Sequence, residues 1–319
     1  MSLVTARASS FAGAWNVLED AMHSAVIPIV PAIQIKRVLY AIDFSEASRA
    51  ALPIVAAIAR RYHSQVFAAH IRPPLPYTMY SPDAVVVMDN KHERDSREAM
   101  DKLLHAEEMA GVAASVIVET GDPAEELRRM VTEHDIDLIV VGTHGHSGLM
   151  RLLMGSLAEE LFRSLHIPVL TVGPHLSPRF ADMQGIKTIV FPTDLSVESR
   201  AAFPLVASLA AEYQSKIVVL HVISSSDALS SAAMELAARA RTQMEKLFCR
   251  EMDPRCGYEL VVDFGDPAER ILHAIHEHQA DVLALGVRHA GEASTHFRNT
   301  VAYKVVQEAE CPVLTQRTA

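Results

Sequence analysis

Two kinds of apolar pattern alternate along the chain: short continuous apolar runs, and longer stretches in which apolar residues recur with helical spacing. Within residues 35–173 the continuous runs, which we predict to be strands, are Val38–Ile42, Val66–Ile71, Ser115–Val118, Leu138–Val141 and Val169–Val172. The stretches that we predict to be helices are Ala47–Arg61, a polar stretch ending at Glu107, Ala124–Glu133 and Leu157–Leu165. Buried strands that alternate with helices favour βαβ units and a parallel sheet.

Most of this pattern occurs twice. Residues 35–70 align with residues 186–221 at a constant offset of 151, and 15 of the 36 aligned positions are identical. Chance would give about two or three identities, so this is an internal repeat. Further along the chain the offset is 144, because the segment GDPAE at 121–125 returns at 265–269. The first copy therefore holds 151 − 144 = 7 additional residues, located between residues 70 and 121.

The repeat predicts two tandem α/β domains, residues 35–173 and 186–319, with a polar linker at 174–185 and an N-terminal extension at 1–34. Because parallel crossovers are right-handed, a doubly wound sheet is the simplest topology for each copy. In the extension, one helical face carries Phe11, Trp15, Leu18 and Met22. We expect this face to pack on its own domain, with a contact between chains as the alternative.

The composition narrows the class of protein. With 29 basic and 39 acidic residues the formal charge is −10, which gives no overall electrostatic reason to bind nucleic acid or an anionic membrane. No apolar run approaches the roughly 20 residues that cross a bilayer. The three cysteines form no disulfide framework, and no secretory signal precedes the repeat, so we expect a cytoplasmic protein.

Chemically unusual residues follow the first and fourth predicted strands of the first copy. The loop after the fourth strand contains Gly142, Gly145 and Gly155-Ser156, the last two directly before a helix. Glycines permit close backbone approach, and a helix start attracts phosphate, so this loop favours an anionic ligand. Ser156 also begins a capping-box sequence, which is compatible with that function. Asp43, after the first strand, is either a helix N-cap or a carboxylate that contacts a ligand.

The spacing Gly142-x2-Gly145-x9-Gly155-Ser156 resembles the ATP-binding motif of the universal stress protein family. The loop after the first strand, which ends at Asp43, the turn GDPAE at 121–125 and the final apolar run of the copy are similar to the same family. This resemblance implies a Rossmann-like fold of the adenine nucleotide alpha hydrolase type. It has strand order 3-2-1-4-5, with helices on both faces and ATP between the loops after strands 1 and 4.

Carried over residue by residue, the resemblance implies that four residues enclose the adenosine: Ala41, Ile42, Asp43 and Ile71. The ribose and phosphates would lie against Val141, Gly142, Thr143, His144 and Gly145, and the end of the phosphate chain against Gly155, Ser156 and Leu157. Mg²⁺ would accompany ATP, held mostly by the phosphates. Family members commonly dimerise through their last strand, so we expect a homodimer or a pseudo-dimer of the two copies within one chain.

The second copy departs from the motif. Gly142 aligns with Gly286, but Gly145 aligns with His289 and Gly155 with Asn299. A Cβ at either lost glycine would crowd a phosphate, so we expect the second copy to serve structure or regulation rather than ATP binding. Arg288 and His289 leave open the binding of a different anion.

We therefore expect an ATP-binding module with a regulatory or protective function in stress. The alternative is an enzyme, either a slow ATP hydrolase or an adenylyl-transferring enzyme, although no P-loop lysine motif is present and no catalytic residue can be named. A metal-binding protein is a third possibility, because His144, His146 and a group at 273–278 are close in sequence, but we expect these histidines to be solvent-exposed. The segment 72–90 is interpreted as a surface loop, with a lid over the nucleotide as the alternative.

Overall fold

The computed structural model describes residues 33–74, 82–143, 157, 160, 161, 164–224, 230–287 and 300–317. In the first copy the strands are β1 (Arg37–Ala41), β2 (Gln65–Arg72), β3 (Ala113–Thr120), β4 (Leu138–Gly142) and β5 (Val169–Val172). The helices between them are α2 (Glu46–Ala50), α3 (Leu52–Tyr62), α4 (Pro82–Leu104), the 3-10 turn η1 (Glu107–Met109) and α5 (Pro123–Glu133). The N-terminal face of Phe11, Trp15, Leu18 and Met22 lies outside the described residues.

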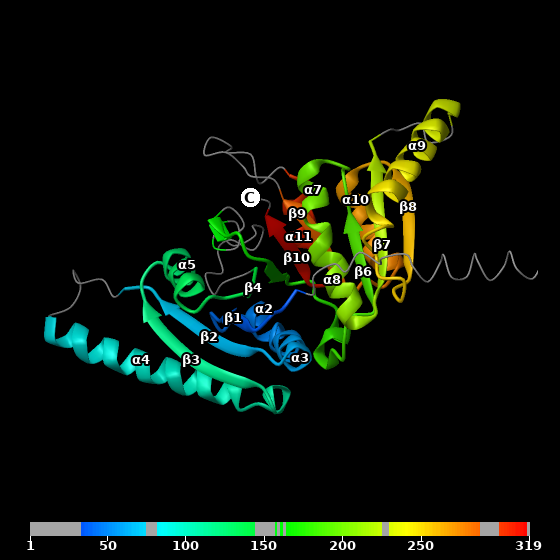
Figure 1. Cartoon of the computed structure of the whole chain (residues 1–319). Helices are drawn as coiled ribbons and strands as arrows, with labels where there is room; N and C mark the ends of the chain where they lie inside the picture. The colour runs from blue at the N-terminus through cyan, green and yellow to red at the C-terminus, as the bar shows by residue number, and fades with distance from the viewer. Residues whose placement is uncertain are drawn as a thin grey trace, which may run out of the picture.

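The second copy repeats this succession of elements. Its strands are β6 (Thr188–Pro192), β7 (Lys216–Ile223), β8 (Tyr258–Phe264), β9 (Val282–Val287) and β10 (Val313–Arg317). Its helices are α7 (Val197–Ala201), α8 (Phe203–Tyr213), α9 (Ser231–Phe248), α10 (Pro267–Glu277) and α11 (Val301–Glu308). The alternation of strands and helices expected from the apolar pattern is therefore present in both halves of the chain (Figure 1).

The ten strands of the described residues form one sheet, in the order β3-β2-β1-β4-β5-β10-β9-β6-β7-β8. Within each copy the neighbours are parallel and follow the order 3-2-1-4-5. The chain moves from β1 to β3 in one direction and then returns past β1 to β4 and β5. Because the crossovers are right-handed, this reversal places helices on both faces of the sheet, as α4 and α5 lie on opposite sides of β2 and β3 (Figure 1).

The two copies meet through β5 and β10, the only antiparallel neighbours among the described strands. The register pairs Leu170 with Leu314, which are aligned residues of the repeat, so a pseudo-twofold axis passes between them. Intrachain pairing through the last strand is thus present. Because β5 and β10 run in opposite directions, the carboxyl ends of the strands lie at one edge of the sheet in the first copy and at the opposite edge in the second.

Helix starts follow directly from local sequence. Asp122 is the N-cap of α5 and accepts hydrogen bonds from the backbone N–H groups of Ala124 and Glu125, each at 3.0 Å, with Pro123 at the first helical position. Asp266 is the N-cap of α10 and accepts from the Glu269 N–H at 3.1 Å. These carboxylates satisfy amides that have no partner within the helix. The repeated Asp-Pro pair therefore has a structural function.

Residues 174–185, expected to be a polar linker, are folded against both copies. They contain the 3-10 turn η2 (Pro178–Asp182), which contacts α3 of the first copy. The Phe180 side chain is 2% exposed, and Arg179 forms an ion pair at 3.2 Å with Asp281 of the second copy. We call these residues the strap, because they attach to both copies rather than merely connecting them.

The prediction of a surface loop at 72–90 is wrong at both ends. Arg72 is the last residue of β2, and α4 begins at Pro82, so residues 82–90 are helical, while 75–81 lie outside the described residues. Three consecutive valines at 85–87 weaken the helical signal in the sequence, because β-branched residues are poor helix formers. The buried Arg72 side chain fixes this part of α4 through an ion pair with Asp89 at 2.9 Å.

The strap should contribute to stability. We predict that Phe180→Ala lowers the free energy of unfolding by about 3–5 kcal/mol, because it removes a fully buried aromatic side chain. His175→Ala, at an exposed position of the same segment, should change it by less than about 0.5 kcal/mol. Urea unfolding of both variants measures this difference, and equal stabilities would mean that the strap is only a connector.

Candidate functional site

The strand order places a topological switch point between β1 and β4. These strands are parallel neighbours, with Tyr40 opposite Val140, yet the chain leaves them toward opposite sides of the sheet. Open α/β sheets bind ligands beyond the carboxyl ends of the strands at such a point. The structure brings to this edge Ala41, Ile42, Asp43, Val141, Gly142 and Thr143.

The loop after β1 is held by backbone and side-chain hydrogen bonds. The Ile42 N–H donates to the carbonyl of Ala69 at 2.8 Å, which extends the pairing with β2 by one residue. Asp43 is half-buried, and its Oδ1 accepts from the Ser45 N–H at 3.0 Å. Phe44, between them, has a φ of 61°. The loop thus makes a tight turn whose shape depends on the Asp43 carboxylate.

Asp43 is not a helix cap. The N-cap of α2 is Ser45, whose Oγ accepts from the Ser48 N–H at 3.2 Å. The capping interpretation of Asp43 is therefore wrong by two residues, because the turn at Phe44 delays the helix. A carboxylate that shapes the loop and remains half-exposed at the switch point is also placed to accept hydrogen bonds from a ligand's hydroxyl or amino groups.

Gly142, the first glycine of the motif, is required by packing within the protein. A Cβ built on it would lie 2.7 Å from the backbone nitrogen of Ser48 in α2. Gly286 is in the same position in the second copy, where a Cβ would lie 2.8 Å from the Cα of Ser199 in α7. Because both contacts are with backbone, neither can be relieved by a side-chain rotation. This explains why the second copy keeps this glycine although it lacks the other two.

The remaining predicted residues are placed as follows. Thr143 is 1% exposed and its N–H donates to the Val172 carbonyl at 3.0 Å. Ile71 lies near the end of β2, and Leu157 is partly buried against the core. His144, Gly145, Gly155 and Ser156 lie outside the described residues.

His70 is a residue of this edge that sequence reasoning missed. Its Nδ1 lies 2.7 Å from the carbonyl oxygen of Ile42, and its ring lies against Phe44 with centroids 4.7 Å apart. An N–H at Nδ1 would donate to that carbonyl, so the imidazole supports the loop that carries Asp43. Burial lowers the pKa of His70 below 6.5, and the positive charge of Arg72 acts in the same direction, against the bond to Ile42. A histidine near the end of the second strand in both copies was the signal available in the sequence.

The second copy reproduces the loop with different chemistry. Asp194 accepts from the Ser196 N–H at 3.0 Å, and Nδ1 of His221 lies 2.8 Å from the Thr193 carbonyl oxygen. Thr193 stands where the first copy has Ile42. Thr193 is 6% exposed, and its hydroxyl oxygen accepts from the Ser199 hydroxyl at 2.7 Å. Arg288, His289 and Asn299 lie outside the described residues.

The histidines near the end of α10 each lie beside a different carboxylate. The pairs are His273 with Glu277 at 3.4 Å, His276 with Glu310 at 4.0 Å and His278 with Glu259 at 3.9 Å. In the part of the chain that the structure describes, no three His, Cys, Asp or Glu side chains are grouped so that they could hold a metal ion. His144 and His146 are not among those residues.

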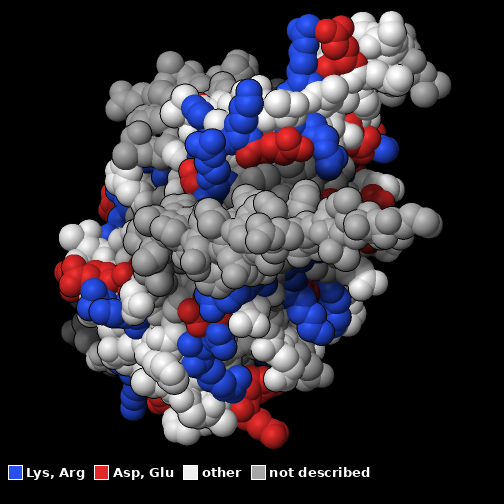
Figure 2. Space-filling model, turned by 45° about the vertical axis from the view of Figure 1, so that its right-hand side comes forward, with Lys and Arg blue, Asp and Glu red and all other residues white. Residues whose placement is uncertain are grey.

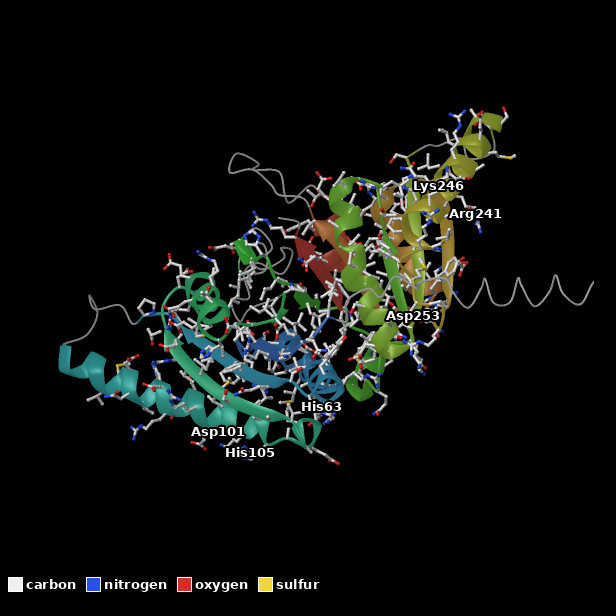
Figure 3. The ribbon with its side chains drawn as sticks, in the orientation of Figure 1. His63, Asp101, His105, Arg241, Lys246 and Asp253 are labelled. Atoms are coloured by element: carbon white, nitrogen blue, oxygen red, sulfur yellow. The ribbon has the colours of Figure 1, made fainter. Side chains whose placement is uncertain are left out.

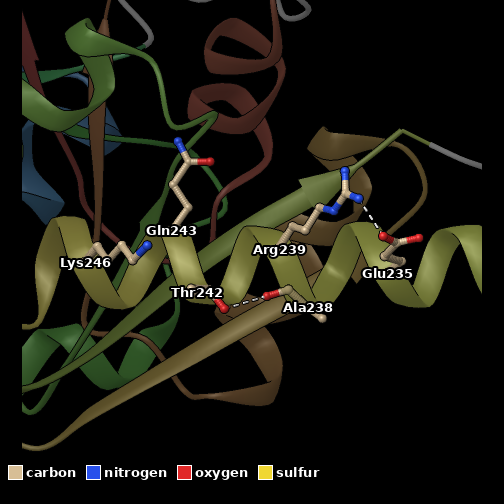
Figure 4. Close-up of a pocket in the computed structure, with 6 residues that line it drawn as sticks. All are labelled: Glu235, Ala238, Arg239, Thr242, Gln243 and Lys246. Carbon is tan, nitrogen blue, oxygen red and sulfur yellow. Dashed lines mark hydrogen bonds and ion pairs between the residues drawn. The ribbon is translucent and has the colours of Figure 1, made fainter.

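Other polar groups lie away from the switch point. Asp101 is on α4, His105 directly follows this helix, and Arg241 and Lys246 are on α9, at the outer parts of the molecule (Figure 3). A surface hollow runs along α9, where all its described lining residues lie, among them Glu235, Thr242 and Lys246 (Figure 4). Basic and acidic side chains both occur over the described part of the face in Figure 2. None of these features brings polar groups of different elements together as the β1–β4 edge does.

The comparisons with known proteins agree with the fold. The model of the universal stress protein family matches residues 34–173 and again residues 185–317. The chain belongs to the universal stress protein family.

Individual universal stress proteins match one copy or both. Universal stress protein MJ0531 of Methanocaldococcus jannaschii is 29% identical over 138 residues, which cover 43% of this chain and 81% of that protein. Universal stress protein YxiE of Bacillus subtilis is 30% identical over 144 residues, or 43% of this chain and 97% of that protein. The crystal structure of a universal stress protein from Archaeoglobus fulgidus superposes with a TM-score of 0.66 at 18% identity, covering 90% of this chain and 100% of that one, which shows a shared two-copy fold.

Among its described residues, this universal stress protein contains no helix that is both long and apolar enough to cross a membrane. Cys249, Cys256 and Cys311 are free thiols.

Gly142 and Gly286 should be equally important for folding of this universal stress protein. We predict that Gly142→Ala and Gly286→Ala each lower the free energy of unfolding by about 1–3 kcal/mol, because the new methyl group overlaps helix backbone. Gly257→Ala is the control, since a Cβ there meets only the Lys216 side chain at 3.7 Å. Chemical unfolding compares the three variants. A Gly142→Ala protein as stable as the wild type would contradict the packing requirement.

His70 should make stability depend on pH. Its folded-state pKa lies below 6.5, so the unfolded chain binds this proton first as the pH falls. The contribution of His70 is therefore complete above the unfolded-state pKa and is lost as the pH falls through the folded-state pKa. We predict that His70→Gln loses less stability than the wild type between about pH 7.5 and about pH 5. Urea unfolding across this range tests the prediction, and parallel curves would contradict it.

Proposed function

We propose that the first copy binds ATP at the edge formed by the ends of β1 and β4, and that the protein is a nucleotide-dependent regulatory or protective module. The observation that carries this proposal is the position of Asp43, a half-exposed carboxylate at the topological switch point. Membership of the universal stress protein family and the complete glycine motif of the first copy support it.

In this proposal, each group has a distinct function. Asp43 accepts hydrogen bonds from the ribose hydroxyls or the adenine amino group, and the apolar residues Ala41, Ile42 and Ile71 enclose the adenosine. The glycine loop from Gly142 to Gly155, with Ser156, offers backbone amides to the phosphates, which a helix start favours. Mg²⁺ enters with ATP and is held mainly by its phosphates.

The second copy, in the same proposal, binds no ATP. Two glycines of the motif, Gly145 and Gly155, align with His289 and Asn299, whose Cβ atoms would crowd a phosphate. We assign residues 35–173 to the ATP-binding domain and 186–319 to a domain with a structural or regulatory function. No described cluster favours catalysis, so we propose a binding protein that is at most a slow hydrolase, located in the cytoplasm.

The nucleotide content of freshly purified protein tests the proposal directly. We expect about one ATP per chain on denaturation, because one of the two motifs is complete. Two nucleotides per chain would show that the second copy also binds. A protein that is empty and also fails to bind added Mg-ATP would overturn the proposal while leaving the fold intact.

Asp43 and Asp194 provide a matched pair of variants. Both carboxylates accept a backbone N–H two residues ahead at 3.0 Å, so replacement by Ala should cost each loop a similar amount of stability. We predict that only Asp43→Ala weakens ATP binding, by about 10- to 100-fold, which corresponds to loss of a hydrogen bond to a charged group. Titration calorimetry measures this, and equal affinities in the two variants would place the nucleotide elsewhere.

A further inference from the structure

At the interface between the two copies, some residues contact the residue that is aligned with them in the other copy. Tyr62 aligns with Tyr213, and their rings lie edge to face with centroids 6.2 Å apart. Leu170 is likewise paired with its equivalent Leu314. A residue that touches its own equivalent lies on the pseudo-twofold axis. In a symmetric dimer of identical chains, such a position would have to be compatible with itself.

The position next to Tyr62 violates this symmetry. Arg61 aligns with Glu212, and the two side chains form an ion pair across the axis with Nε 2.7 Å from Oε1. Arg61 also donates to the Glu212 carbonyl, and its guanidinium carbon lies 5.5 Å from the centroid of the Tyr213 ring. Of the ion pairs between described residues, this one joins the first copy directly to the second.

The surrounding apolar contacts do not distinguish the copies. A small cavity near the axis is lined by apolar residues, among them the aligned pairs Ile54–Leu205 and Ile58–Leu209. Such residues would pack nearly as well between two first copies or two second copies. The charges would not: two first copies would place Arg61 against Arg61, and two second copies would place Glu212 against Glu212. Because like charges repel each other, pairing of a first copy with a second copy is favoured over either like pairing. We call this the mixed pairing.

A first copy could pair with the second copy of its own chain or of another chain, and the strap decides between these two arrangements. Phe180 is buried, η2 contacts α3 of the first copy, and Arg179 binds Asp281 of the second. An exchange of copies between two chains would have to detach the strap from one of these contacts. The first copy is therefore paired with the second copy of its own chain.

We propose that Arg61 and Glu212 determine the partner at this interface: they select the second copy of the same chain and reject the same copy of another chain. This inference rests on the fold and is independent of nucleotide binding. It implies that two chains do not associate through the surface formed by β5, β10, α3 and α8.

Charge variants of the full chain test the pair. Arg61→Glu and Glu212→Arg each place like charges across the axis and should lower the unfolding midpoint by about 2–4 °C. The double variant restores opposite charges and should recover most of this loss. Arg61→Gln, which removes the pair without repulsion, should lose less than Arg61→Glu. The losses should shrink at about 1 M salt, where the screening length falls to about 3 Å.

Arg60→Glu is the control for these variants. The Arg60 guanidinium donates to the carbonyls of Glu108 and Ala110 in its own copy, so Glu212→Arg should not rescue its replacement. Rescue of Arg60→Glu to the same extent, or no recovery in the Arg61→Glu/Glu212→Arg double variant, would overturn the proposal.

Cysteine cross-linking tests the choice of partner. In a Cys249→Ser background, Tyr62→Cys alone should give no covalent dimer with a short bis-maleimide, because the introduced thiol would face Tyr213 of its own chain. Tyr62→Cys with Tyr213→Cys should give a cross-link within the 34.9 kDa chain. A covalent dimer of the single variant would show that like copies pair and would refute the proposal. A dimeric mass of the wild type by light scattering that Arg61→Glu abolishes would show that the ion pair joins two chains, and would refute it as well.

Discussion

The antiparallel hydrogen bonding between β5 and β10 is the contact on which the arrangement of the chain depends. An isolated copy would expose β5 or β10 as an open sheet edge, which invites uncontrolled pairing. Joining the two edges removes both at once and merges two five-stranded sheets into a single one of ten strands. Because the join is antiparallel, the two carboxyl edges face opposite ways, so the two candidate sites cannot share a ligand.

The alternation of strands and helices, the duplication and the capping by Asp122 and Asp266 could all be predicted from the sequence. Each depends on residues within a few positions of one another or on a direct repeat of letters. The strand order also followed, but through a resemblance to a family rather than from the apolar pattern. The capping interpretation of Asp43 failed because a single residue with positive φ, Phe44, shifts the helix start to Ser45.

Other features depend on contacts between distant segments, which no local pattern reveals. The start of α4 could not be predicted, because three consecutive valines weaken the helical pattern there. The ion pair between Arg72 of β2 and Asp89 of α4 fixes the first turns of this helix. His70 supports the Ile42 carbonyl from the neighbouring strand. Gly142 was assigned to phosphate binding from its motif, yet the backbone of α2 alone already requires a glycine there. The proposed phosphate contact and the packing requirement fall on the same residue, and the second copy keeps this glycine without the rest of the motif.

The strap has a consequence for how the protein can respond to a ligand. Two-domain proteins commonly undergo hinge closure around a bound molecule. This motion needs a connecting segment whose backbone dihedral angles are free to change. Here the connection is buried at Phe180 and bonded on both sides, and the sheet runs unbroken through the join. A hinge motion between the lobes would therefore break both the core and the sheet. Any signal that depends on ligand binding must arise from reshaping of loops along one edge, on a scaffold that keeps its overall form.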